Sequence, residues 1–169
     1  MKSAAGTKII AGVMLLVLIL TLSACGPKSG KKDVSMFDLQ KAMIAAADFK
    51  EMNYVSSSDD GAGDLFTYLS DMDYSKVEQF FLSYAKDGKG NADEVAVVRV
   101  KTKADLDEAV KSLENHLQKR IQLYRTYDPT QSEKIEKGIV FSQDDLAILI
   151  VSDDNAAVKS ACIEYLNAN

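Results

Sequence analysis

Six consecutive apolar residues, Leu-Ala-Ile-Leu-Ile-Val at 146–151, constrain the fold of this chain more than any other segment. A strand with one face in water alternates polar and apolar side chains, so an uninterrupted apolar run of this length indicates a strand covered on both faces. The polar triplet 143–145 predicts a turn before this run, and 138–142 predicts a strand before the turn. We therefore expect an antiparallel hairpin whose second strand lies at the centre of a sheet.

A long amphipathic helix is predicted upstream of this hairpin. Thr102 is its expected N-cap, and Asp105 follows three residues later, where a carboxylate favours the first helical turn. Apolar residues then recur at spacings of three and four, as on one helix face: Leu106, Val110, Leu113, Leu117, Ile121 and Tyr124. Pro129 disfavours helical geometry at Asp128, so we expect the helix to end near this step.

A second hairpin is predicted before the long helix. Residues 77–84 alternate as in a strand, although part of their apolar spacing also fits a helix. The next segment, 94–101, contains four valines, which favour a strand, and the breaker-rich loop 87–91 lies between the two. We therefore interpret both segments as strands.

Two further helices complete the predicted order. One begins at Ser35 and ends near Asp48, and the other is terminal and capped by Asp153 or Asp154. The type of the apolar stretch 65–69 stays open. The expected fold is α+β, with a single antiparallel four-stranded sheet, helices on its face, and the order α-β-β-α-β-β-α.

The first residues of the chain have the organisation of an export signal. Lys2 and Lys8 give a basic start, and the stretch 9–22 is uncharged. This stretch is too short to cross a bilayer, which needs about 20 apolar residues, but it suits the apolar region of a signal peptide.

The tetrad Leu-Ser-Ala-Cys at 22–25 resembles the lipobox of bacterial lipoproteins. The resemblance implies cleavage between Ala24 and Cys25, a diacylglyceryl group on the Cys25 thiol, and an extracytoplasmic protein anchored by lipid to the cell membrane. The alternative is an ordinary secretory signal with a chance cysteine. The expected division is a signal peptide at 1–24, a lipidated cysteine and flexible tether at 25–33, and one α+β globular domain at 34–169.

The part of the chain after this signal is acidic. Loss of Lys2 and Lys8 moves the formal net charge from −5 to −7, and no basic stripe remains that could neutralise phosphates. Nucleic acid is therefore not an expected partner. The expected partners are the membrane lipid through Cys25 and an envelope protein, because the tether 26–32 reaches about 25 Å at most.

A strand at 92–98 and a helix that runs into Tyr-Arg-Thr-Tyr-Asp-Pro-Thr-Gln at 124–131 carry a family resemblance. The chain resembles an uncharacterised group of bacterial lipoproteins, a domain-of-unknown-function family found mainly in Gram-positive anaerobes. The similarity covers the chain from Val34 to its C-terminus. It implies an envelope lipoprotein and implies no activity.

The most specific part of that resemblance is the pattern Tyr-x-Pro-x-Gln, made by Tyr127, Pro129 and Gln131. We interpret it as a helix exit, in which the tyrosine ring packs and the proline blocks further helix. The alternative is a partner or ligand surface on a loop held by a rigid helix. Three further tyrosines are expected in loops that could line a shallow site: Tyr54, Tyr68 and Tyr74.

Two side chains that often carry chemistry are expected to be structural. The sole histidine, His116, lies at the edge of the stripe of the long helix and has no second His or Cys for a metal site. We expect a satisfied or exposed histidine, and the alternative is a ligand or a base. Cys162 falls on the apolar face of the terminal helix, where a free cysteine packs as a small hydrophobe.

Metal binding has weak candidates. The run from Asp71 to Ser75 begins like an EF-hand loop, but the glycine at the sixth position and the glutamate at the twelfth are missing. Asp59, Asp60 and Asp64, with glycines between them, are weak candidates for extracellular calcium, and a solvated acidic loop is the preferred interpretation.

No constellation of residues indicates a reaction, so no cofactor and no catalytic residue is assigned, and we expect the domain not to be an enzyme. The expected function is a non-catalytic binding or adaptor module at the outer face of the cytoplasmic membrane. Two alternatives stay open. One is a receptor for a small ligand or an ion, and the other is an envelope hydrolase that uses two carboxylates.

Overall fold

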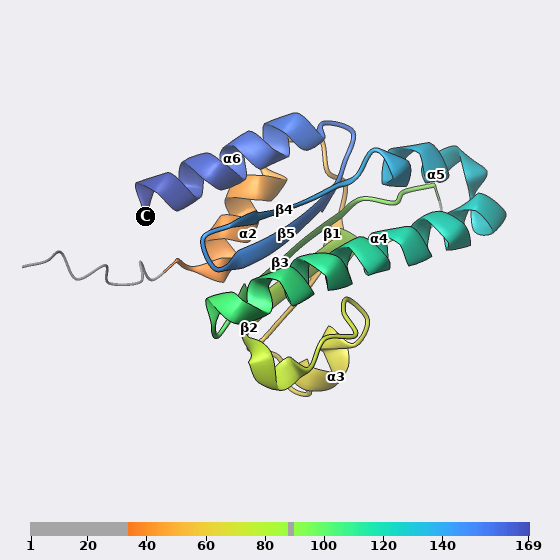
Figure 1. The fold of residues 1–169 in the computed structure, drawn as a ribbon. Helices are drawn as coiled ribbons and strands as arrows, with labels where there is room; N and C mark the ends of the chain where they lie inside the picture. Colours follow the sequence, from red (N-terminus) through yellow and green to blue (C-terminus); the bar gives the residue numbers. More distant parts are fainter. Residues whose placement is uncertain (1–33, 88–89) are drawn as a thin grey trace, which may run out of the picture. The chain divides into compact units, whose positions relative to one another are not determined.

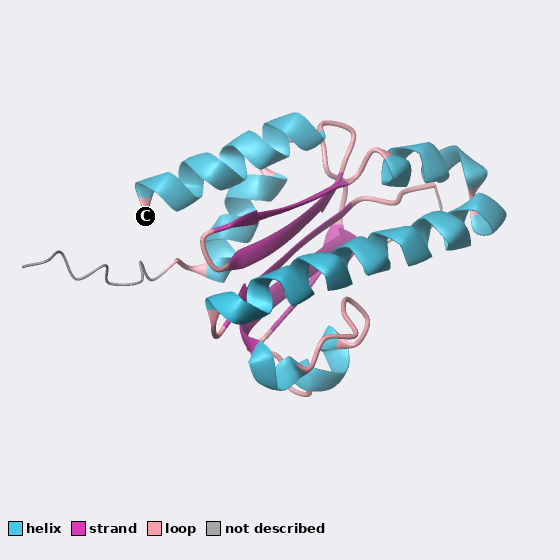
Figure 2. Cartoon of the chain, in the orientation of Figure 1, coloured by secondary structure: helices cyan, strands magenta, loops and turns pink. Residues whose placement is uncertain are grey.

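The computed structural model describes residues 34–87 and 90–169. The predicted signal peptide, Cys25 and the tether lie outside the described residues. Five strands form one antiparallel sheet in the order β1-β2-β3-β5-β4 (Figures 1 and 2). The strands are β1 (Met52–Ser56), β2 (Val77–Ala85), β3 (Glu94–Val100), β4 (Ile139–Gln143) and β5 (Leu146–Val151).

Helices cover both faces of this sheet (Figure 1). The longest helix, α4, packs on one face, and α2 and α6 pack on the other and against each other. The helices are α2 (Met36–Ile44), α3 (Ala62–Phe66), α4 (Leu106–Tyr127), α5 (Pro129–Glu136) and α6 (Asn155–Ala168), with short 3₁₀ turns at Tyr74–Lys76 and Lys103–Asp105. In the described ranges, no helix is long and apolar enough to cross a membrane.

The apolar segment 146–151 is the buried strand β5 that its composition predicted. All six residues are buried, and β5 pairs with β3 on one side and β4 on the other. Its odd-numbered side chains join the core under α4, and its even-numbered side chains join the core under α2 and α6. The α+β class and both predicted hairpins are therefore confirmed.

The prediction of four strands is wrong, because β1 adds a fifth at the edge of the sheet. Most of β1 is half-buried, and its sequence Met-Asn-Tyr-Val-Ser lacks an apolar run. An edge strand has one neighbouring strand and is less deeply buried than a central strand, so its alternation of apolar and polar residues is weak. The predicted order also omits α3, whose last two residues overlap the stretch 65–69, and α5, which begins at Pro129.

Two of the three predicted N-caps are confirmed. The third is wrong, because Thr102 precedes a 3₁₀ turn without a side-chain cap bond and α4 begins at Leu106. The Ser35 hydroxyl accepts the Asp38 N–H, and the Asp154 carboxylate accepts the Ala157 N–H. The first helix ends at Ile44, four residues before the predicted end. The long helix ends at Tyr127 as expected, but Pro129 then begins α5, because proline is well suited to the first position of a helix.

Gly138 allows α5 to turn directly into β4. A Cβ atom at this position would lie 2.9 Å from the Val151 Cγ2 atom and 3.0 Å from the Leu117 Cδ1 atom. The Ile135 backbone carbonyl oxygen would also lie 2.9 Å from this Cβ atom, and because this oxygen is fixed in the backbone, residue 138 has no room for a side chain without a shift of its surroundings.

Candidate functional site

The strongest concentration of buried polar groups lies in the segment 91–94, where the chain enters β3. Every residue in this segment is buried, including Asn91, Asp93 and Glu94. The peptide groups are held from two helices: the Ala92 N–H donates to the Gln131 Oε1 atom at 3.1 Å, and the Ala92 carbonyl accepts from the Arg120 Nη2 atom at 3.1 Å. The segment is thus fixed by α4 on one side and by α5 on the other.

Glu94 points toward α4 and meets two basic side chains. Its Oε1 atom lies 2.8 Å from the His116 Nε2 atom, and its Oε2 atom lies 3.1 Å from the Arg120 Nη1 atom. Desolvation by burial raises the pKa of this carboxyl, but the Arg120 guanidinium and the contact with His116 outweigh it, so the pKa lies below its ordinary value. Glu94 is therefore a buried carboxylate that stays ionised.

Arg120 is held in place from several directions. The Arg120 Nη1 atom has no hydrogen-bond partner, so its interaction with the Glu94 carboxylate is an ion pair without a hydrogen bond. The Tyr124 ring lies one turn further along α4, with its centroid 5.4 Å from the guanidinium carbon. His116 and Arg120 stand four residues apart on α4, so they face the same way and reach the same carboxylate.

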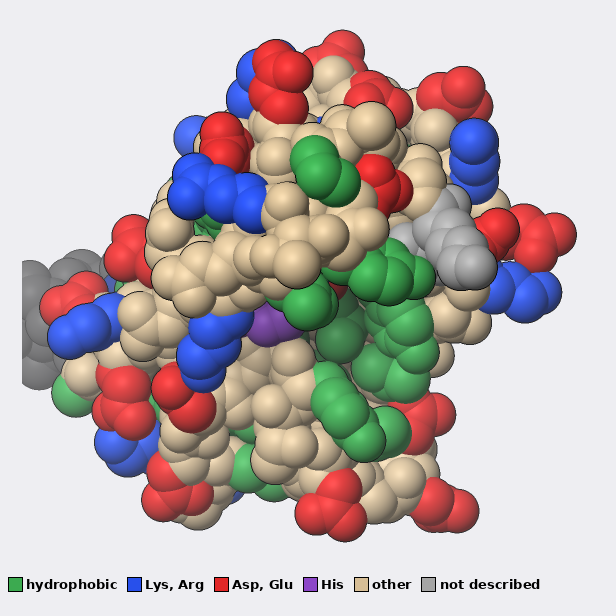
Figure 3. All heavy atoms as spheres, turned by 90° about the vertical axis from the view of Figure 1, so that its right-hand side faces the viewer, with side chains coloured by type: hydrophobic (Ala, Val, Ile, Leu, Met, Phe, Trp, Pro, Cys, Tyr) green, Lys and Arg blue, Asp and Glu red, His purple; other side chains and the backbone are tan. Residues whose placement is uncertain are grey.

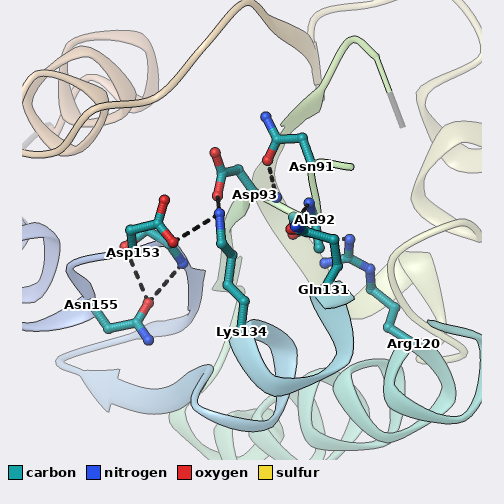
Figure 4. Close-up of polar contacts among 9 residues, drawn as sticks. Asn91, Ala92, Asp93, Arg120, Gln131, Lys134, Asp153 and Asn155 are labelled. Atoms are coloured by element: carbon teal, nitrogen blue, oxygen red, sulfur yellow. Dashed lines mark hydrogen bonds and ion pairs between the residues drawn. The ribbon is translucent and has the colours of Figure 1, made fainter. Parts of the chain in front are cut away.

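Asp93 points toward α5 and meets Lys134. The Lys134 ammonium donates to the Asp93 Oδ1 atom at 2.9 Å and lies 3.0 Å from the Asp153 Oδ1 atom, as Figure 4 shows. Burial lowers the pKa of Lys134, but the two carboxylates outweigh this effect and raise it above its ordinary value. One lysine therefore joins the entrance of β3, the helix α5 and the turn before α6.

A groove opens beside Glu94, between α4 and the segment that follows α3. It has a volume of about 510 Å³, and Val55, Leu82 and Tyr84 on β1 and β2 contribute to its lining. Tyr68 and Leu123 form parts of its opposite walls and are strongly exposed, at 75% and 61%. Figure 3 shows hydrophobic side chains gathered around a hollow on this side of the molecule. We call this feature the aromatic groove.

A second hollow, which we call the polar pocket, lies on the α5 side of segment 91–94. It has a volume of about 430 Å³, and its lining includes Asn91, Asp93, Gln131, Lys134 and Asp153. The Gln131 side chain uses its oxygen to hold Ala92 (Figure 4). The floor of this pocket carries both signs of charge, and Lys134 already neutralises much of the carboxylate charge.

The three residues of the Tyr-x-Pro-x-Gln pattern occupy different positions. Gln131 lines the polar pocket, whereas Tyr127 and Pro129 line neither the pocket nor the aromatic groove. Tyr127 is exposed, and its ring meets the Tyr124 ring edge-on at 6.1 Å. The pattern marks the end of α4, as the helix-exit interpretation expected. The rest of that interpretation is wrong, because Pro129 begins α5 and most of Tyr127 is exposed. The glutamine holds the Ala92 N–H at the entrance of β3.

The acidic loop shows no arrangement for a metal. Asp59, Asp60 and Asp64 are all exposed, and the Asp59 Oδ2 atom accepts the Ser56 N–H at 2.6 Å. Within the ranges 34–87 and 90–169, no group of three or more His, Cys, Asp or Glu side chains is placed to hold a metal ion.

The tyrosines expected in loops also separate. Tyr54 lies on β1 and stacks on Phe81, and Tyr74 packs on Phe66 and Phe80 in the core. Of the three predicted tyrosines, Tyr68 is the one that borders the aromatic groove.

His116 and Cys162 are both structural in the sense that the sequence indicated. His116 is satisfied by Glu94 and mostly buried. Cys162 is fully buried, and burial raises the pKa of its thiol from 9.0 to about 12. A thiol with such a pKa carries almost no thiolate at neutral pH and is a poor nucleophile.

Glu94 and Arg120 were missed as site residues by sequence reasoning, although a signal was present. Asp93 and Glu94 are adjacent acids at the start of a valine-rich strand, where charges are unexpected. His116 and Arg120 share one side of the predicted long helix. The sequence pattern that predicts a buried ion cluster has two parts. Two adjacent acids stand at the start of a buried strand, and two bases stand four residues apart on a helix.

The fold and the site define a class: an α+β domain with a five-stranded antiparallel sheet, a buried ion cluster and an open apolar groove above it. The chain belongs to the family described as Domain of unknown function (DUF4358), whose model matches residues 45–152. The predicted membership in an uncharacterised family is thereby confirmed. Neither the curated proteins nor the solved structures gave a match. The matched region contains the whole lining of the aromatic groove.

Proposed function

We propose that this protein is a non-catalytic binding module of the cell envelope, anchored by lipid on Cys25 at the outer face of the cytoplasmic membrane. In this proposal, the aromatic groove receives a segment of an envelope protein. The observation that carries the proposal is the groove itself, which combines apolar and aromatic walls with a rigid, charge-balanced base.

The distribution of exposed apolar side chains supports a binding surface. Five large hydrophobic side chains are exposed in the described part of the chain, and three of them, Tyr68, Tyr84 and Leu123, line the groove. Clustered apolar surface is typical of interaction sites, and tyrosine is enriched at interfaces because it offers both a ring and a hydroxyl.

The state of the two acidic side chains supports a role without catalysis. The carboxylates among the groove-lining residues are Asp93 and Glu94. Both are buried, and each is paired with basic side chains, Lys134 for Asp93 and Arg120 with His116 for Glu94. A glycosidase needs two carboxyl groups that face the substrate across a cleft. The present pair instead fixes the strand entrance.

The amino-terminal sequence supports the location. The tetrad 22–25 fits a lipid attachment site, and two acyl chains give stable membrane attachment where one gives marginal binding. A tether of residues 26–32 spans about 25 Å at most, so a partner must lie close to the membrane surface. An envelope protein satisfies this condition.

The test is chemical cross-linking in intact cells of the full-length anchored protein, followed by purification in mild detergent and mass spectrometry. We expect a reproducible envelope protein to be recovered with the wild type and to be lost with Leu123→Asp, which places a charge on the groove wall. Gln122→Asp is the matched control, because it adds the same charge at the next exposed position of α4, outside the groove lining. Equal recovery with Leu123→Asp and wild type would reject the groove as the binding site.

A further inference from the structure

Strand β1 has an open backbone edge. Its ladder with β2 is bounded by two hydrogen bonds: the Lys86 N–H donates to the Glu51 carbonyl at 3.0 Å, and the Ser57 N–H donates to the Phe80 carbonyl at 3.0 Å. In an antiparallel pair, hydrogen-bonded residues alternate along each strand. The residues of β1 whose N–H and C=O groups point away from β2 are therefore Met52, Tyr54 and Ser56.

One end of this edge is already closed by a side chain. The Ser56 N–H donates to the Asp59 Oδ2 atom at 2.6 Å, within the turn that leads to α3. Met52 and Tyr54 thus leave two N–H donors and two carbonyl acceptors directed outward, because each residue carries one of each. Such an edge is a template for another extended chain.

Hollows flank β1 on both faces of the sheet. On the α4 face, Val55 contributes to the aromatic groove. On the opposite face, a hollow of about 330 Å³ is lined by Phe37, Tyr54 and Ser56, among other residues, and Phe37 is 52% exposed. Side chains of an extended strand alternate between the two faces. A strand added at β1 would therefore place successive side chains beside one hollow and then the other.

We propose that the partner segment binds by strand addition at β1. Its occupant is an extended stretch of polypeptide with apolar side chains on the face toward the aromatic groove, hydrogen-bonded to Met52 and Tyr54. This inference rests on the proposed function, since one row of its side chains occupies the aromatic groove. Outward main-chain donors and acceptors at strand spacing match the main chain of a peptide, and the flanking hollows supply selectivity for its side chains.

The probe is a displayed library of random peptides of about 12 residues, long enough to cover a strand of usual length, selected on the full-length protein in mild detergent. Met52→Pro removes an outward N–H and no bond to β2. Ser142→Pro is the matched control: the two-residue turn at 144–145 makes Gln143 and Leu146 a hydrogen-bonded pair, so the Ser142 N–H also points outward, but on β4. Thermal unfolding verifies that both variants are folded.

We expect selected peptides to bind Met52→Pro about tenfold more weakly than wild type, since one main-chain hydrogen bond at the edge is lost, and to bind Ser142→Pro unchanged. Amide exchange in the wild type gives a second readout that needs no variant: bound peptide slows exchange at Met52 and Tyr54.

Three outcomes would overturn strand addition. They are equal binding to wild type and Met52→Pro, unchanged exchange at Met52 and Tyr54, and failure to select any peptide. The proposed function has its own readout in the cross-linking experiment. Peptides that bind Met52→Pro normally but fail on Leu123→Asp would reject strand addition and keep the groove.

Discussion

At the scale of single residues, the central feature is that two adjacent acids serve different helices. Asp93 pairs with Lys134 of α5, and Glu94 pairs with His116 and Arg120 of α4. Neighbouring side chains of an extended segment point in opposite directions, so one short stretch can tie two elements at once. The local sequence indicates burial of a charged pair but does not indicate which base each acid meets.

Replacement of Glu94 by glutamine should destabilise the protein. The variant leaves Arg120 buried without its carboxylate, and the loss of one partner of a buried ion pair costs about 3 kcal/mol or more. Urea unfolding at pH 7 measures this difference. Glu164→Gln, on the exposed surface of α6, is the matched control and should leave the unfolding midpoint unchanged. An unchanged midpoint for Glu94→Gln would show that the cluster contributes no stability.

The comparison of wild type with Glu94→Gln also predicts a pH dependence of stability. The pKa of Glu94 in the folded state lies below its ordinary value of 4.5. Between those two values the unfolded chain binds a proton that the folded chain does not, so the stability contributed by Glu94 is complete above the ordinary pKa and falls as the pH drops through the folded pKa. The difference in unfolding free energy between wild type and Glu94→Gln should therefore be constant above pH ~5 and shrink below it. A difference that grows in acid would contradict the assigned direction.

At the scale of elements, the junction of α5 and β4 is set by one glycine. Gly138→Ala should destabilise the protein by about 1–3 kcal/mol, because the new methyl group overlaps atoms of Leu117 and Val151. Gly63→Ala is the matched control. It lies in α3, where the added methyl meets Tyr74 at an ordinary 3.4 Å, and alanine favours the helix. Thermal unfolding of both variants should thus shift in opposite directions, and equal shifts would reject the close approach at residue 138.

Elements with a strong internal pattern were predictable, and elements defined by neighbours were not. The stripe of α4 and the apolar run of β5 carry their own periodicity, so their type followed from sequence. Strand β1 is half-buried at an edge, and it is a strand because β2 lies beside it. Helix α5 begins at Pro129, a residue from which the sequence predicted the end of a helix.

The aromatic groove illustrates the same limit for the site. Its walls come from segments around Val55, Tyr68, Tyr84 and Leu123, which are separated along the chain and share no motif. Their meeting depends on the position of α4 across the sheet. The Tyr-x-Pro-x-Gln pattern was visible in sequence, but its role is to fix the helix junction and the entrance of β3.

At the scale of the whole molecule, the family match and the folded unit have different limits. The match covers residues 45–152, whereas α2 and α6 lie outside it and cover one face of the sheet. That face includes Phe81, Ile148 and Ile150, all fully buried. The matched region therefore contains the groove and omits the two helices that cover the opposite core.

Residues 45–152 expressed alone should fail to form a stable soluble domain. Removal of α2 and α6 exposes a contiguous apolar face, and exposed faces of this kind lead to aggregation. Size-exclusion chromatography and binding of a hydrophobic dye would compare this fragment with residues 34–169. A monomeric fragment with cooperative unfolding would show that the sheet is stable when helices pack on the α4 face alone.

The proposed anchor predicts the distribution of the whole protein in cells. Cys25→Ser should move it from the membrane fraction to unprocessed or secreted forms, because the lipid attachment atom is lost. Cys162→Ser is the matched control, as it removes the other cysteine and should leave fractionation unchanged. Mature-length, lipid-free protein that still fractionates with membranes would contradict the anchor.

The strand that completes the middle of the sheet comes last in the chain among the five described strands. Strand β5 lies between β3 and β4, yet all four other strands precede it in the sequence. Until β5 emerges, the inner edge of β3 has no partner strand, and its valines lack their neighbours. Unpaired edges and exposed apolar surface make incomplete chains prone to aggregate. The sheet therefore closes in a late step, after the four other strands have left the ribosome.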